Sequence, residues 1–133
     1  MLTRFAARVH VAYPEAIRLL PAAASRCVVS GNPVRDRSTM GRAEARRSFG
    51  LPEDVTLTFV TGGSQGSLAL NRGVTSYVEG VSKGDLLRPE LLHVLWATGR
   101  KHFDSVQAAL DALGTLEWVH PLPYIEDMPG ALA

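Results

Sequence analysis

The residues with the clearest chemical capacity lie in a glycine-rich segment at 62–66 (GGSQG). A β-rich run at 55–60 precedes this segment and a helical pattern follows it, so we expect it to join a strand to a helix N-terminus. Unpaired backbone N–H groups and the positive end of the helix dipole would then favour an anion. The spacing fits neither the dinucleotide fingerprint nor the P-loop. From this loop alone, a phosphate or diphosphate site and a plain strand-to-helix turn both stay open.

Two other segments carry groups suited to a ligand. Residues 31–35 (GNPVR) form a turn followed by Arg35, whose guanidinium suits forked contacts with a phosphate or a planar heterocycle, although a simple turn explains the segment as well. Residues 124–128 (YIEDM) place Asp127 just before a Met-Pro pair, which predicts a helix N-cap and not a catalyst. The four histidines show no metal-ligand spacing, and no Ser-His-Asp or Cys-His set can be placed by motif.

The elements that would position these segments alternate between strand and helix. Apolar runs predict strands at 55–60, 91–97 and 116–119, and helical spacing predicts helices at 70–81, at 103–113 and from 128 onward. This alternation predicts an α/β fold with a parallel sheet, covered on both faces and joined by right-handed crossovers. Three strands are too few for a finished sheet of this kind, so we expect an incomplete one. Upstream, the sequence predicts short strands at 9–13 and 27–29, a helical turn at 15–20 and a short helix at 43–49.

Composition places the chain among ordinary globular proteins. It has 133 residues, of which 46% are hydrophobic and 20% charged, and this excludes a disordered tail or a fibre. The single cysteine, Cys27, cannot form an intramolecular disulfide and favours a reducing compartment. Arg4 and Arg8 interrupt the only apolar stretch near the first residue, so no signal peptide is predicted. The longest uncharged run is rich in glycine, and no transmembrane helix is predicted either.

The formal net charge of +1 hides an asymmetry along the chain. Residues 1–50 carry nine arginines against three acidic residues, whereas residues 51–133 carry five basic and ten acidic residues. The basic part is either a solvated surface or a face for an anionic ligand or an anionic membrane. Nucleic acid is disfavoured as a partner, because few aromatic residues are interleaved with the arginines.

Taken together and in order, the segments at 31–35, 62–66 and 124–128 closely resemble the MurG family of bacterial UDP-N-acetylglucosamine transferases. Residues 49–52 (FGLP), Asn71 and the Tyr-Pro-Glu stretch at 13–15 extend the resemblance over nearly the whole chain. The resemblance implies a glycosyltransferase of the GT-B type, in which two Rossmann-like domains enclose the active site. Residues 1–34 would end the N-terminal acceptor domain, residues 35–54 would form the interdomain passage and a short helix, and residues 55–133 would begin the C-terminal donor domain.

The resemblance also implies which residues bind UDP-N-acetylglucosamine. Arg35 corresponds to the family's donor-binding arginine, and Ser64 to the loop serine that contacts the diphosphate, with Gly63 and Gln65 beside it. Ile125 corresponds to the residue whose backbone reads the uracil edge. No catalytic residue is expected in this chain, because the family's histidine loop and later C-terminal segment have no counterpart here. We expect no metal ion and no cofactor.

The implied reaction is inverting transfer of N-acetylglucosamine to undecaprenyl-diphosphoryl-muramoyl-pentapeptide, the lipid I to lipid II step of peptidoglycan synthesis in cell-wall biogenesis. The implied partners are the UDP-sugar, the undecaprenyl-linked acceptor and an anionic membrane surface. The implied location is peripheral, on the cytoplasmic face of the bacterial inner membrane. The alternatives are another GT-B glycosyltransferase with a different lipid acceptor, and a non-catalytic nucleotide-sugar-binding module. We expect the 133-residue chain on its own to be inactive.

Overall fold

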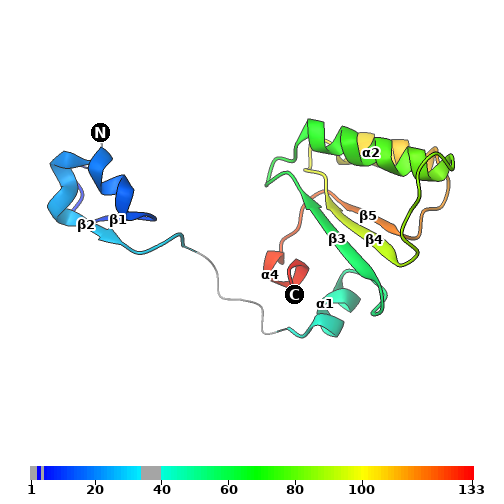
Figure 1. The fold of residues 1–133 in the computed structure, drawn as a ribbon, viewed down its shortest axis with the longest axis horizontal. Helices are drawn as coiled ribbons and strands as arrows, with labels where there is room; N and C mark the ends of the chain where they lie inside the picture. The colour runs from blue at the N-terminus through cyan, green and yellow to red at the C-terminus, as the bar shows by residue number, and fades with distance from the viewer. Residues whose placement is uncertain (1–2, 4, 34–39) are drawn as a thin grey trace. The chain divides into compact units, whose positions relative to one another are not determined.

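The computed structural model describes residues 3, 5–33 and 40–133. Its contacts divide the chain into two compact units, residues 1–37 and residues 38–133 (Figure 1). Among the described residues, no helix is long and apolar enough to cross a membrane. Each unit is described separately below.

The first unit is built on two short parallel strands, β1 (Val9–Val11) and β2 (Cys27–Val29), with Val9 opposite Cys27 in the ladder. Two 3₁₀ helices, η2 (Pro14–Leu19) and η3 (Pro21–Arg26), connect them. The sequence predicts a single helical turn at 15–20, and the second 3₁₀ helix is an addition. Both helices begin with proline, whose fixed φ suits a first helical position but which cannot continue a helix from the preceding residue.

The second unit contains a parallel sheet of three strands in the order β3-β4-β5. The strands are β3 (Thr56–Thr61), β4 (Leu92–Ala97) and β5 (Val119–Leu122), and the crossovers are α2 (Leu68–Ser82) and α3 (Phe103–Asp111). The predicted α/β class and parallel sheet are confirmed. The two long helices end near Gly84 and Gly114, whose φ values of 79° and 92° suit residues beyond a helix C-terminus.

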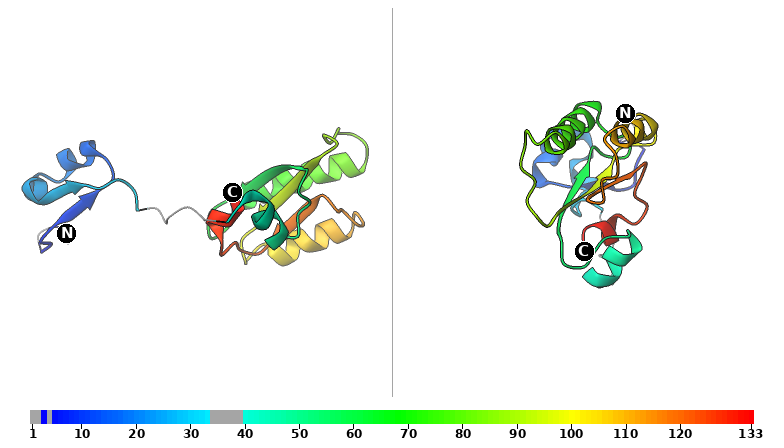
Figure 2. Two further views of the ribbon diagram at one scale, coloured as in Figure 1. Left: turned by 90° about the horizontal axis from the view of Figure 1, so that it is seen from below. Right: turned by 90° about the vertical axis from the view of Figure 1, so that its right-hand side faces the viewer.

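Both faces of this sheet are covered. Helices α2 and α3 lie on one face, where Val78 and Val106 pack against Val94 and Trp96 of the central strand. The opposite face carries α1 (Arg42–Ser48) and α4 (Met128–Ala131), as the right-hand view of Figure 2 shows. The core on that face consists of the buried residues Leu51, Leu95, Ala97, Ile125 and Ala131. The short helix predicted at 43–49 is therefore one of the covering helices of the second unit.

The predicted position of the last strand, 116–119, is wrong, since β5 spans Val119–Leu122. Residues 116–119 form a turn in which the Val119 amide donates to the Leu116 carbonyl at 3.2 Å. The strand contains Pro121, which argues against an interior strand by sequence. In the described sheet β5 lies at an edge, and the amide of Thr98 donates to the carbonyl of Leu122. The ring nitrogen of Pro121 accordingly faces away from β4, where no N–H is needed.

Candidate functional site

The three strands of the second unit end level with one another. In the ladders Thr61 lies opposite Ala97, and Ala97 lies opposite Leu122. Three loops, at 62–67, 98–102 and 123–127, therefore leave the sheet from the same edge. This is the carboxyl edge, where open parallel sheets covered by helices bind their ligands.

The glycine-rich loop at 62–67 turns sharply before α2. Gly63 and Gly66 have φ values of 77° and 73°, and the Gly66 amide donates to the Gly63 carbonyl at 3.1 Å. Ser67 caps the helix, with its hydroxyl accepting from the Leu70 amide at 3.4 Å. Ser64 and Gln65 are exposed, and within the described part of the chain their amides donate to no protein acceptor. The loop thus presents free N–H donors at the positive end of a 15-residue helix.

The glycine-rich loop packs backbone to backbone against the next loop. A Cβ atom on Gly66 would clash with the Thr98 carbonyl, and one on Gly99 would clash with the Gln65 carbonyl. Gly99 also has a φ of 87°, which only glycine adopts without strain. The first two loops of the edge are therefore in direct backbone contact, and a residue larger than glycine at position 66 or 99 would prevent this contact.

Asn71 links the start of helix α2 to the end of strand β4 through two hydrogen bonds. Its side chain is 3% exposed, and its amide group donates to the Thr98 carbonyl at 2.8 Å while accepting from the Trp96 indole N–H at 3.0 Å. Both of these buried groups would otherwise lack a partner, which costs stability. Asn71 therefore fixes the start of α2 against the end of β4.

The third loop is anchored by Ile125. The residue is only 3% exposed and packs in the α1/α4 core, whereas the neighbouring Tyr124 and Glu126 are exposed. Just beyond, an Asp127 carboxylate oxygen accepts from the Gly130 amide at 3.0 Å and caps α4. The cap predicted at Asp127 is confirmed. The Ile125 side chain therefore anchors the third loop in the α1/α4 core.

Arg100 connects the second loop to the third. Its guanidinium carbon lies 5.1 Å from the centre of the Tyr124 ring, and a guanidinium nitrogen lies 4.0 Å from the Glu126 carboxylate. Sequence reasoning missed this residue. An arginine directly after a glycine at the end of a predicted buried strand was the signal that could have found it.

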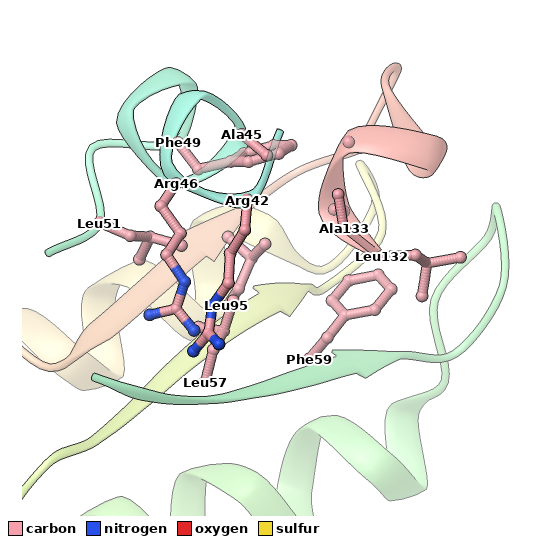
Figure 3. Close-up of a pocket in the computed structure, with 12 residues that line it drawn as sticks. Arg42, Ala45, Arg46, Phe49, Leu51, Leu57, Phe59, Leu95, Leu132 and Ala133 are labelled. Carbon is pink, nitrogen blue, oxygen red and sulfur yellow. The ribbon is translucent and has the colours of Figure 1, made fainter. Parts of the chain in front are cut away.

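The second unit also has a cavity that none of the residues of the three loops line. A cavity of about 290 Å³ lies between α1 and α4 over the sheet face (Figure 3). Its floor is apolar, with Leu57, Phe59 and Leu95, and Arg46 beside it is already bound to the Val55 carbonyl at 2.8 Å. No pair of acidic or nucleophilic side chains lines it.

Two histidines stack near the amino ends of their strands. His93 Nδ1 and His120 Nε2 are 2.9 Å apart, and the rings are nearly parallel at 15°. Burial lowers the pKa of both imidazoles below 6.5; the Arg88 charge adds to this for His93, and the neighbouring His93 adds to it for His120. Both side chains are half-buried, and their facing ring nitrogens are close enough to share one N–H.

Comparison with known protein families identifies the domain that carries the three loops. Residues 57–133 match the glycosyltransferase family 28 C-terminal domain. The chain belongs to this family. The matched region begins in β3 and includes all three loops of the carboxyl edge. The resemblance to MurG and the expectation of a GT-B-type, Rossmann-like α/β fragment are thereby confirmed.

Two curated relatives have the name UDP-N-acetylglucosamine–N-acetylmuramyl-(pentapeptide) pyrophosphoryl-undecaprenol N-acetylglucosamine transferase. The protein from Salinibacter ruber is 36% identical over the whole chain, which covers 34% of that protein. The protein from Lacticaseibacillus casei is 33% identical over 98% of the chain, again covering 34% of its own length. The chain thus spans about a third of the length of these relatives. No solved structure matches it.

Within the family 28 domain, the predicted donor residues fall on two of the three loops. Gly63, Ser64 and Gln65 lie on the first loop and Ile125 on the third, both leaving the same edge of the sheet. Arg35 lies outside the described residues, so its placement stays a prediction. Among the described residues no group of three or more His, Cys, Asp or Glu side chains is placed to hold a metal ion. The amides of Ser64 and Gln65 give this edge hydrogen-bond donors suited to an anion.

Proposed function

We propose that the carboxyl edge of the second unit binds the UDP part of UDP-N-acetylglucosamine. The observation that carries the proposal is the pair of free amides at Ser64 and Gln65, held at the N-terminus of α2 in a family 28 domain. Backbone N–H groups and a helix dipole are the donors that a diphosphate needs, and the Ser64 hydroxyl adds another. The Ile125 main chain would match uracil, which offers a donor between two carbonyls.

In the whole protein this domain would serve a glycosyl transfer. The relatives' name supports N-acetylglucosamine as the sugar and undecaprenyl-diphosphoryl-muramoyl-pentapeptide as the acceptor, for peptidoglycan synthesis. The acceptor hydroxyl would lose its proton to a base outside this chain, its oxygen would bond to the anomeric carbon, and the bond to UDP would break. The Ser64 loop would stabilise the charge that develops on the departing UDP. Arg35 would add a guanidinium, and Gln65 would line the sugar pocket.

The proposed location follows from the same reasoning. An enzyme acting on an undecaprenyl-linked acceptor must meet a membrane surface, so we place it peripherally on the cytoplasmic face of the inner membrane. The excess of arginine in the first fifty residues supports an anionic surface as partner. The 133-residue chain would supply donor binding without the catalytic base, so we expect no transfer activity from it alone.

The test is isothermal titration calorimetry of the chain with UDP, which measures the dissociation constant. Replacing Ser64 with alanine removes one hydroxyl bond to a charged group, so we expect Ser64→Ala to weaken binding by roughly 10- to 100-fold. Ser76→Ala is the matched control, because Ser76 is exposed on α2 away from the loop, and it should bind as the wild type does. Arg35→Ala should also weaken binding.

Two results would count against this site. Wild-type affinity in both Ser64→Ala and Arg35→Ala would show that UDP is held elsewhere. Equal affinity for ADP and UDP would remove the role of the Ile125 main chain, since adenine lacks the hydrogen-bonding edge of uracil.

A further inference from the structure

The main chain of the third loop has few partners within the protein. Within the described part of the chain, residues 124–126 make no backbone hydrogen bond to the protein. The buried Ile125 side chain fixes the depth of the loop, but a single side chain does not fix the orientation of the peptide groups on either side of it. A loop that reads a ligand through its backbone needs those groups in one orientation before binding, so some other contact must hold them.

Arg100 is placed to provide that contact. It touches the residues on both sides of Ile125, the Tyr124 ring at 5.1 Å and the Glu126 carboxylate at 4.0 Å. Both of these side chains are exposed while that of Ile125 is buried, so the guanidinium spans the outer side of the loop above the anchored residue.

The backbone that carries Arg100 is itself fixed. Thr98 donates to the Leu122 carbonyl through its amide at 3.0 Å and through its hydroxyl at 3.2 Å. Gly99 lies so close to Gln65 that no Cβ fits between them. Arg100 therefore extends from a backbone segment that is held by the central strand and the glycine-rich loop. Its contacts with the third loop can restrict the motion of that loop.

We propose that Arg100 is a positioning residue, which holds the main chain of residues 124–126 in the orientation that reads the uracil of the UDP-sugar. This inference rests on the proposed function and adds a residue that acts without touching the nucleotide. Without Arg100, the loop populates the competent orientation for a smaller fraction of the time, and the apparent dissociation constant rises by the inverse of that fraction.

The size of the effect follows from the exposure of the partners. The Arg100 and Glu126 side chains are 70% and 87% exposed, so their ion pair is a weak one, and the contact with the Tyr124 ring adds a comparable amount. We expect Arg100→Met to weaken UDP binding by roughly three- to tenfold. Arg100→Lys keeps the charge near both partners and should retain most of the affinity.

The experiment combines two measurements on the 133-residue chain. Nitrogen-15 relaxation without ligand reports the order parameters of the amides at 124–126, and titrations with UDP and with uridine report affinity. In Arg100→Met the order parameters should fall from roughly 0.85 toward 0.6, and both ligands should lose affinity by the same factor, because the loop reads the base. Arg47→Met is the matched control, since Arg47 forms an exposed ion pair with Glu53 at 3.2 Å, outside the three loops.

Each other outcome overturns the inference in a recognisable way. If Arg100→Met binds UDP as the wild type does, Arg100 has no role in the site. If UDP loses affinity but uridine does not, and the order parameters are unchanged, Arg100 contacts the phosphates directly and is not a positioning residue. If the wild type shows no saturable UDP binding, the proposed function fails, and the inference falls with it before any variant is compared.

Discussion

At the residue scale, two glycines of the first loop are needed for different reasons. Gly66 combines a φ of 73° with a position where any Cβ would meet the Thr98 carbonyl. Gly63 has a similar φ of 77°, but nothing lies within 4 Å of its would-be Cβ. The left-handed backbone alone costs a residue other than glycine about 1–2 kcal/mol. At Gly66 the clash with the Thr98 backbone adds to that cost.

We therefore expect Gly66→Ala to lower the free energy of unfolding by several kcal/mol and Gly63→Ala by only about 1–2 kcal/mol. Urea denaturation of the two variants and the wild type measures the difference, with Gly63→Ala as the internal control for backbone strain. Equal losses in the two variants would mean that the close packing of the first two loops contributes nothing to stability.

Residue types predict part of the candidate site, and long-range packing determines how the rest of it is arranged. Ser64 and Ile125 belong to the segments at 62–66 and 124–128, whose sequences resemble family motifs, so the sequence predicts them as site residues. The bonds that Asn71 makes to Trp96 and Thr98 span 25 and 27 residues, and no local pattern encodes such a partner. The position of Arg100 after a glycine at a strand end could have marked it, but its contacts with Tyr124 and Glu126 depend on the strand register, which the sequence does not give.

At the element scale, the stacked His93 and His120 make the joint between β4 and β5 sensitive to acid. Burial is the main cause that lowers the pKa of both imidazoles in the fold, whereas in the unfolded chain each titrates near 6.5. Between the lowered pKa and 6.5 the unfolded chain binds more protons, so stability rises with pH across this window. The free energy of unfolding has its full value above pH 6.5, and it decreases as the pH falls from 6.5 through the pKa values of the folded state.

We expect His120→Gln to make the free energy of unfolding less dependent on pH below 6.5, because the variant has one fewer proton to take up on unfolding. Denaturation at pH 5.0 and pH 7.5 measures this. His102→Gln is the control, because His102 lies outside the pair at the start of α3. An unchanged slope in His120→Gln would mean that the acid sensitivity of the chain arises elsewhere.

Most elements of the second unit could be predicted from local patterns. Apolar spacing located β3, β4, α2 and α3 to within a few residues, and the Asp127 cap marked the start of α4. The last strand was misplaced because Leu116 and Trp118 look like strand residues, whereas Pro121 within the true strand is tolerated only by its edge position. The second 3₁₀ helix, η3, buries only Ala23, which is 1% exposed, so the sequence has no apolar periodicity that would predict it.

At the scale of the whole molecule, positive charge is concentrated toward the N-terminus. Residues 1–37 carry six arginines and two acidic residues, while the remaining residues carry a net negative charge. Phe5 and Leu19 of the first unit are also 89% and 81% exposed. Basic residues beside exposed apolar side chains are suited to an anionic membrane surface, where each positive charge contributes about 1 kcal/mol at low salt.

We expect the chain to sediment with vesicles of phosphatidylglycerol at low salt and to be released as salt rises, because the attraction is screened within a Debye length of about 10 Å at 0.1 M. Removing two exposed charges of the first unit, with Arg8→Gln and Arg18→Gln together, should weaken binding by roughly tenfold or more. Arg47→Gln with Arg72→Gln removes two equally exposed charges from the second unit and should have a smaller effect. Equal sedimentation with neutral phosphatidylcholine vesicles, or equal losses in the two double variants, would show that the basic N-terminal part does not direct the chain to a membrane.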